Sequence, residues 1–132
     1  MKKLVLGVFL IVVIQACSQK IGVATVANTK WILTEWPGKA LPTTVKATLN
    51  FDAEGKIGGN SFCNGYGGNT TFENGGIKFS QIFGTKMYCE QVGDAENKYT
   101  TDLEAVNGAK LVGEKLQLLK DDQVLMIFTK AE

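Results

Sequence analysis

The chain has 132 residues, of which 45% are hydrophobic and two are proline, so it suits one globular domain and is too short for two of ordinary size. Its formal net charge is +1, and without Lys2 and Lys3, which lie in a segment expected to be removed, 12 lysines would face 13 acidic residues. Nucleic acid and anionic membrane surfaces are therefore not expected partners. The chain has no histidine, the side chain most used for acid–base catalysis, and no arginine, which binds phosphate through bidentate hydrogen bonds.

An export signal is expected over residues 1–16. Lys2 and Lys3 provide a positive start, and residues 4–14 are an unbroken run of apolar residues and glycine. As a helix this run would span roughly 16 Å, well short of a hydrocarbon core of about 30 Å, so it indicates a cleaved signal rather than a permanent membrane span.

The signal ends in Ile14-Gln15-Ala16-Cys17, which resembles the lipobox of bacterial lipoproteins, with Gln15 in place of the usual small residue. Cleavage before Cys17 and its acylation would anchor the protein, because several fatty chains at about 0.8 kcal/mol per buried CH₂ hold stably in a membrane. Ser18 stands where an aspartate often marks inner-membrane retention, which favours the outer membrane, facing the periplasm. The alternative is an ordinary secretory signal with an unrelated cysteine.

Residues 17–28 are expected to be a lipidated start and a linker, because residues 18–28 show no strong pattern. Fully extended, this linker would reach roughly 36–40 Å and hold a domain clear of the lipid headgroups. The folded domain is expected over residues 29–130.

Alternation of apolar and polar residues predicts the strands of this domain. Trp31 and Leu33 mark the first strand, and residues 45–51 form the clearest alternating run. Residues 124–128 are a continuous apolar run, which predicts a central and buried strand. Further strands are expected at residues 56–61, 66–73, 77–79, 110–112 and 116–120, with glycine-containing hairpin turns at 52–55 and 74–76.

One helix is predicted in the second half of the chain. Asp94 is expected to cap it, and Asn107-Gly108 suits a left-handed helix end. Its apolar side, at spacings of four and three, consists of Tyr99, Leu103 and Val106. About eight strands and one helix make an α+β domain built on an antiparallel meander.

Catalytic motifs are missing from the sequence. Without histidine there is no Ser-His or Cys-His pair, no Walker A motif occurs, and two cysteines alone make a poor zinc site. Glu90, Asp94 and Glu96 would support a carboxylate-based hydrolase if they met in a cleft, but the favoured interpretation is solvated groups at a helix N-terminus. We therefore expect no catalytic residue, metal, cofactor or enzymatic activity.

The stretch 58–68 has five glycines among its eleven residues, which indicates bulges, a sharp bend or close backbone contact. It contains Cys63, and two lipid-free cysteines in an exported protein usually pair, so a disulfide to Cys89 is expected. Closing this loop would contribute roughly 3–4 kcal/mol to stability. The alternative is two small buried thiols that stay reduced.

Aromatic side chains would line a groove for a lipid or a peptide if they were exposed, but in alternating strands they more often form the core. Trp36 is the exception, because its place beside Pro37-Gly38 at a strand end predicts partial exposure. The candidate binding residues are Trp36, Tyr66 and Tyr88.

Together these features resemble the META domain, the module of HslJ-type heat-inducible bacterial lipoproteins. The specific part is Cys63-Asn64-Gly65-Tyr66-Gly67-Gly68 with Thr85-Lys86-Met87-Tyr88-Cys89, and Phe62 stands where the family often has glycine. The resemblance implies an antiparallel, barrel-like sheet with one helix packed against it, similar to some pilotin lipoproteins that escort outer-membrane secretins. It also implies a role in envelope stress tolerance or secretion, and the family has no established enzymatic activity.

We therefore expect a non-enzymatic envelope lipoprotein, attached to the membrane through Cys17, that binds an envelope protein or an apolar ligand. The alternative is a purely structural, stress-protective factor without a discrete site. An apolar groove would favour the first hypothesis, and a barrel filled by its own side chains would favour the second.

Overall fold

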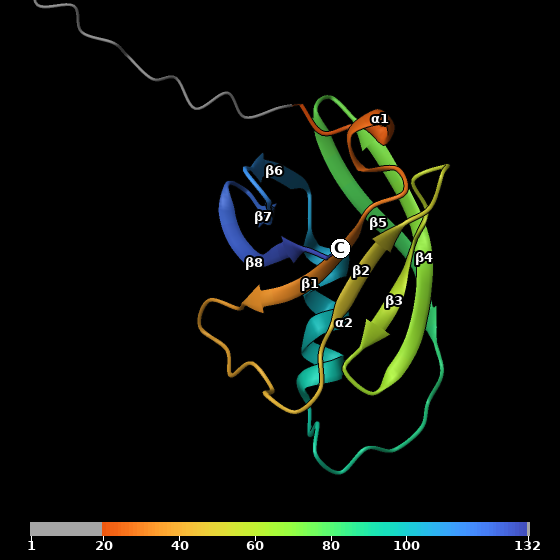
Figure 1. Ribbon diagram of the computed structural model, residues 1–132, viewed down its shortest axis with the longest axis vertical. Helices are drawn as coiled ribbons and strands as arrows, with labels where there is room; N and C mark the ends of the chain where they lie inside the picture. The colour runs from red at the N-terminus through yellow and green to blue at the C-terminus, as the bar shows by residue number, and fades with distance from the viewer. Residues whose placement is uncertain (1–19, 132) are drawn as a thin grey trace, which may run out of the picture.

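The computed structural model describes residues 20–131, which form one eight-stranded antiparallel sheet and two helices (Figure 1). In chain order the elements are α1 (Val23–Val26), β1 (Lys30–Glu35), β2 (Thr48–Phe51), β3 (Ile57–Ser61), β4 (Asn64–Glu73), β5 (Gly76–Gly84), α2 (Ala95–Ala105), β6 (Gly108–Val112), β7 (Lys115–Lys120) and β8 (Gln123–Lys130). The strands lie in the order β5-β4-β3-β2-β1-β8-β7-β6, so two meanders meet where β1 pairs with β8. The predicted fold, a barrel-like antiparallel sheet with one helix packed against it, is confirmed.

The two edge strands of the sheet approach each other at one end only. At the start of β5, a Cβ built on Gly76 would lie 2.7 Å from the carbonyl oxygen of Asn107, just before β6. From there β5 runs away from β6, and α2 occupies the space between them (Figure 1). The sheet is therefore a half-barrel that α2 completes.

Helix α2 fills the interior of this half-barrel. Tyr99 and Leu103, on its inward side, have no exposed surface. The ring of Tyr99 meets those of Phe62, Tyr66 and Phe128, with centroids 5.8, 5.7 and 6.4 Å away. Side chains of one helix and of strands from both meanders thus share one core, which joins the two halves of the sheet.

The final strand, β8, is central but not buried on both faces. It lies between β1 and β7, as its apolar run predicts. Met126 and Phe128 are buried, whereas Leu125 and Ile127 are half-buried. The prediction of full burial is wrong because successive side chains alternate between faces and α2 covers only the concave one.

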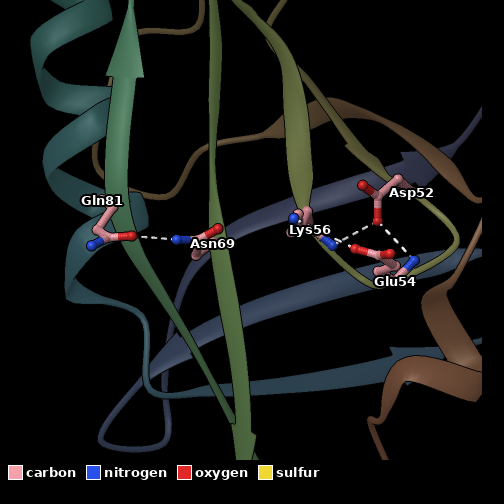
Figure 2. A network of polar contacts seen from close by, with 5 residues as sticks. All are labelled: Asp52, Glu54, Lys56, Asn69 and Gln81. Atoms are coloured by element: carbon pink, nitrogen blue, oxygen red, sulfur yellow. Dashed lines mark hydrogen bonds and ion pairs between the residues drawn. The ribbon is translucent and has the colours of Figure 1, made fainter.

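Two hairpin turns form where glycine and short polar residues predict them. In the turn between β2 and β3, the Asp52 carboxylate accepts the backbone N–H groups of Glu54 and Lys56 at 2.8 and 2.9 Å (Figure 2). Asn74 and Gly75, between β4 and β5, have φ of 52° and 77°, the left-handed pair that a two-residue hairpin requires.

The two largest differences between predicted and observed strand bounds concern β2 and β5. The run 45–51 enters the sheet only at Thr48, with an isolated bridge at Ala47. The strand predicted at 77–79 continues to Gly84, because a bulge lets it turn and go on pairing. At this bulge Gln81 has φ of 53°, and the side-chain amide of Asn69 donates a hydrogen bond across to Gln81 (Figure 2).

Both predicted helix caps need correction. Asp94 occupies the N-cap position of α2, but its carboxylate pairs with Lys98 at 3.1 Å and makes no capping hydrogen bond. At the other end, Val106 is extended, with φ −59° and ψ 132°, so no left-handed residue follows the helix. The chain passes directly into β6 because Asn107 binds the backbone and carboxylate of Asp121 with its side-chain amide.

The domain begins before residue 29. Helix α1 lies in the segment expected to be a linker, and Ile21 and Val26 are buried in the main core. The hydroxyl of Thr25 closes the first turn of α1 on the backbone of Gly22, which explains how so short a helix holds. Residues 1–19, including the predicted signal and Cys17, lie outside the described residues; within 20–131 no helix is long and apolar enough to cross a bilayer.

Candidate functional site

The Cys63–Cys89 disulfide joins two segments that are distant in sequence. Cys63 lies in the two-residue turn between β3 and β4, and Cys89 ends the extended segment 85–89 that follows β5. The two Cα atoms are 6.1 Å apart, within the ordinary range for a disulfide. The bond therefore holds the segment 85–89 against the end of the sheet.

Asn64 binds the same segment through its buried side-chain amide. Its Oδ1 accepts the Met87 backbone N–H at 2.8 Å and the Thr85 hydroxyl at 2.9 Å, and its Nδ2 donates to the Met87 carbonyl at 3.0 Å. The Thr85 N–H also donates to the Gly65 carbonyl at 3.0 Å. The segment thus continues the line of β5, with an amide side chain in place of a neighbouring strand.

Glu96, in the first turn of α2, fastens the helix to this turn. Its two carboxylate oxygens accept the Ser61 hydroxyl at 2.6 Å and the second N–H of Asn64 at 2.9 Å. Asp94 instead pairs with Lys98, and Glu90 is exposed, so these three carboxylates do not share one partner. Within residues 20–131 no group of three metal-ligating side chains occurs. The observed role of Glu96 is to join helix and sheet.

The hydroxyl of Tyr66 makes hydrogen bonds within the core. Its hydroxyl donates to the Thr48 carbonyl at 2.7 Å and shares a 2.8 Å hydrogen bond with the hydroxyl of Tyr99. Burial raises the pKa of both phenols above the usual value of about 10, and for Tyr99 the nearby Tyr66 hydroxyl raises it further. Both hydroxyls therefore stay protonated and link β2, β4 and α2.

Trp36 is not the exposed aromatic that its position beside Pro37 predicts. It is 5% exposed, and its ring stacks on Phe62 with centroids 5.7 Å apart. Its Nε1 donates to the Asp102 carboxylate at 2.8 Å, and Lys39 pairs with the same oxygen at 2.5 Å. The expectation fails because Asp102, on α2, covers the strand end and supplies the indole with a buried partner.

Three large apolar side chains stand out from the end of β5 and the segment that follows it. Phe83, Met87 and Tyr88 are 72%, 65% and 90% exposed. They border a groove of about 690 Å³ between this segment and α2, within the size range of small-molecule sites. Of the candidate binding residues, Tyr66 and Tyr88 both line this groove and Trp36 does not.

The two walls of the groove differ in character. One wall is mainly apolar and comes from the end of β5 and from Met87 and Tyr88. The other comes from α2, where Glu96, Thr100 and Glu104 follow one another at successive turns of the helix. Within the described part of the chain neither Glu96 nor Glu104 has an ion-pair partner. The groove is therefore open, apolar on one side and acidic on the other.

Phe83, Met87 and Asn64 are not among the candidate binding residues that the sequence predicts. Phe83 lies beyond the strand predicted at 77–79, near the end of β5, and its ring lies over Gly67, where a Cβ would approach it to 2.9 Å. The segment is held by the Thr85 hydroxyl and by the backbone of Met87, so residues 85–88 remain exposed although the chain there is fixed.

Comparison with known proteins supports the fold. A family model for the META domain matches residues 24–132. A solved structure described as a protein from Burkholderia xenovorans has a TM-score of 0.72 at 22% identity, covering 83% of this chain and 86% of its own. A second NMR structure has a TM-score of 0.65 at 18% identity, covering 83% and 94%. No curated protein matches the chain.

Proposed function

The chain belongs to the META domain family, and from that premise we propose that it is a non-enzymatic lipoprotein of the bacterial envelope whose groove binds a partner protein. The observation that carries this proposal is the exposure of Phe83, Met87 and Tyr88 together. Large apolar side chains grouped at a groove are characteristic of interaction sites. The backbone beneath Met87 and Tyr88 is fixed by Asn64 and the disulfide, so little entropy is lost when a partner binds.

A surface partner is favoured over an apolar ligand held inside the barrel. The interior of the half-barrel is occupied by side chains of α2 and the sheet, including Tyr99, Leu103 and Phe128, all without exposed surface. A lipid chain there would have to displace core side chains, whereas the groove is already open. A role in envelope stress tolerance or secretion would follow from the partner that the groove binds.

Attachment through Cys17 would direct the groove away from the membrane. Because Ile21 is buried, only residues 18–20 separate Cys17 from the folded domain, a reach of about 14 Å at most. Helix α1 packs on the turn between β2 and β3, where Val23 lies near Gly55, whereas the disulfide lies at the opposite end of β3. Figure 1 shows α1 at one end of the molecule and the segment 85–94 at the other.

Anchoring and binding are tested separately. Cys17→Ala should abolish acylation, detected by mass spectrometry, and release the protein from the membrane fraction. The double variant Met87→Ser and Tyr88→Ser should lose a partner that is crosslinked to the anchored protein in intact envelopes.

Val112→Ser is the matched control for the binding test, because Val112 is 49% exposed on the other edge strand, β6. A processed, lipid-bearing Cys17→Ala protein would contradict the lipoprotein assignment. Equal crosslinking by the double variant and the control would contradict binding at the groove.

A further inference from the structure

We propose that the groove binds an extended segment of the partner as an added strand on the free edge of β5, with apolar and basic side chains alternating along that segment. This inference rests on the proposed partner-binding function and specifies the chemical class of the partner. It follows from the unpaired strand edge, from the continuation of that edge beyond β5 and from the charge of the facing helix.

The first observation is the free edge itself. Among the described residues β5 has one strand neighbour, β4, so alternate backbone N–H and C=O groups on its other side have no strand to bind. Near Gly76 this edge is closed by the approach of Asn107, but toward Gly84 it opens into the groove. An added strand therefore has one place to enter, the end that carries Phe83.

The second observation is that the edge extends beyond β5. Thr85 pairs with the Gly65 carbonyl, and Met87 pairs with the amide of Asn64, so residues 82–87 lie in one extended line. Six residues at about 3.3 Å each offer an edge of about 20 Å. That length suits strand addition, in which main-chain hydrogen bonds supply affinity and alternate side chains supply specificity.

The third observation is the charge of the facing wall. Glu104 is exposed on the groove side of α2 and has no ion-pair partner within residues 20–131. Glu96, eight residues earlier, also lacks an ion pair there, and its carboxylate, held by Ser61 and Asn64, adds negative charge to the same wall. A lysine or arginine of an added strand would pair with Glu104, while alternate residues of that strand would contact Met87 and Tyr88. Lys86, also in the lining, disfavours a partner that is basic at every position.

A short synthetic peptide of about nine residues, with lysine alternating with valine and phenylalanine, is the probe for this site. Fluorescence anisotropy should show saturable binding to the folded domain that weakens as salt is added. Replacing the lysines by glutamate, or the central valine by proline, should lower affinity by about tenfold or more, because charge and strand pairing are lost.

Variants of the protein locate the site. Glu104→Lys should weaken binding of the lysine peptide by about fivefold and Tyr88→Ala by a similar factor, since both side chains are exposed and their loss leaves the fold intact. Glu114→Lys and Val112→Ala, on the opposite edge of the sheet, are the matched controls and should bind as the parent does. On binding, amide protons of residues 82–87 should gain protection from exchange.

The outcomes separate the strand proposal from the function on which it rests. If the peptide with proline bound as well as the parent peptide, or the controls weakened binding as much as Glu104→Lys, strand addition would be wrong. If the domain instead formed a dimer lost in Tyr88→Ala, measured by sedimentation, the occupant would be a second copy of the chain. If the peptides did not bind while the double variant Met87→Ser and Tyr88→Ser still lost a crosslinked partner, binding of a partner at the groove would be supported and strand addition would be wrong.

Discussion

The side-chain amide of Asn64 pairs with the backbone of Met87 as one peptide group pairs with another in a strand ladder. Oδ1 accepts the Met87 N–H at 2.8 Å, and Nδ2 donates to the Met87 carbonyl at 3.0 Å. One buried residue thereby orders a segment that has no strand beside it. This pairing connects the glycine-rich hairpin to the exposed ridge formed by Met87 and Tyr88.

Replacing Asn64 should loosen this segment and destabilise the domain. Asn64→Ala leaves the Met87 N–H and carbonyl without their partner, and we expect a loss of about 2–3 kcal/mol in unfolding free energy. Asn64→Asp should cost more at neutral pH, because the new carboxylate faces Glu96, and the difference should shrink in acid as one carboxyl is protonated. Urea unfolding at two pH values measures both effects, and equal losses at both would contradict the role given to Glu96.

Removal of the disulfide should lower stability by about 2–5 kcal/mol. Cys63→Ser and Cys89→Ser should each have this effect, and the double variant should lose about as much as one, because the second change breaks no further bond. Chemical unfolding with and without a reductant measures it. Complete thiol labelling of the native protein under oxidising conditions would show that the cysteines are unpaired.

Alanine substitutions at Gly59 and Gly58 compare a glycine that the close approach of β2 requires with a neighbouring glycine that has more space. A Cβ on Gly59, which has φ of 147°, would overlap the carbonyl of Thr48, whereas a Cβ on Gly58 would lie 3.5 Å from the carbonyl of Tyr66. Gly59→Ala should therefore cost about 3 kcal/mol or prevent folding, and Gly58→Ala about 1 kcal/mol or less. Thermal unfolding of the two variants compares them directly, and similar melting temperatures would refute the argument.

The buried tyrosine pair predicts loss of stability in alkali. Burial raises the pKa of Tyr66 and Tyr99 above about 10, so above that pH the unfolded chain loses protons that the native protein keeps. Their contribution is thus complete below pH 10 and is lost as the pH rises, by about 1.4 kcal/mol per unit for each tyrosine. The double variant Tyr66→Phe and Tyr99→Phe should show a shallower fall between pH 10 and 11 than the parent, and an unchanged slope would contradict the prediction.

Phe62 combines an unfavourable backbone with a favourable side chain. Its φ is 69°, in the left-handed region where the family often has glycine, yet its ring is buried between Trp36 and Tyr99. Phe62→Ala keeps the strain and loses the ring, at about 3–5 kcal/mol. Phe62→Gly also loses the ring but relieves about 1–2 kcal/mol of strain, so the glycine variant should be the more stable of the two. Denaturant midpoints test this order, and the reverse order would mean that strain at Phe62 is negligible.

Much of the architecture is predictable because local patterns decide it. The alternation of apolar and polar residues predicts the strands. The pair Asn74-Gly75 predicts a two-residue hairpin turn, and both residues adopt the left-handed backbone conformation that this turn requires. The single long helix follows from the apolar spacing of Tyr99, Leu103 and Val106, all of which are buried. In each case the information lies within a few neighbouring residues.

What local sequence does not decide is exposure, because exposure depends on which distant element covers a side chain. Asp102 reaches Trp36 across 66 residues and buries an indole that its neighbours predict to be exposed. Residues 20–28 show no pattern of their own, yet Ile21 and Val26 complete a core supplied by the rest of the chain. Short segments gain order from such tertiary packing rather than from their own propensity.

The groove is likewise predictable from the sequence only in part. The paired Cys63-Asn64 and Thr85-x-Met87-x-Cys89 patterns mark the two segments, and the cysteines alone predict that these segments meet. That Met87 and Tyr88 face outward, opposite carboxylates of α2, follows only from the curl of the sheet and from the amide of Asn64. The sequence by itself therefore determined the strands, the helix and the link between the two motifs, whereas the tertiary structure decided which side chains a partner can reach, because long-range packing selects the buried face.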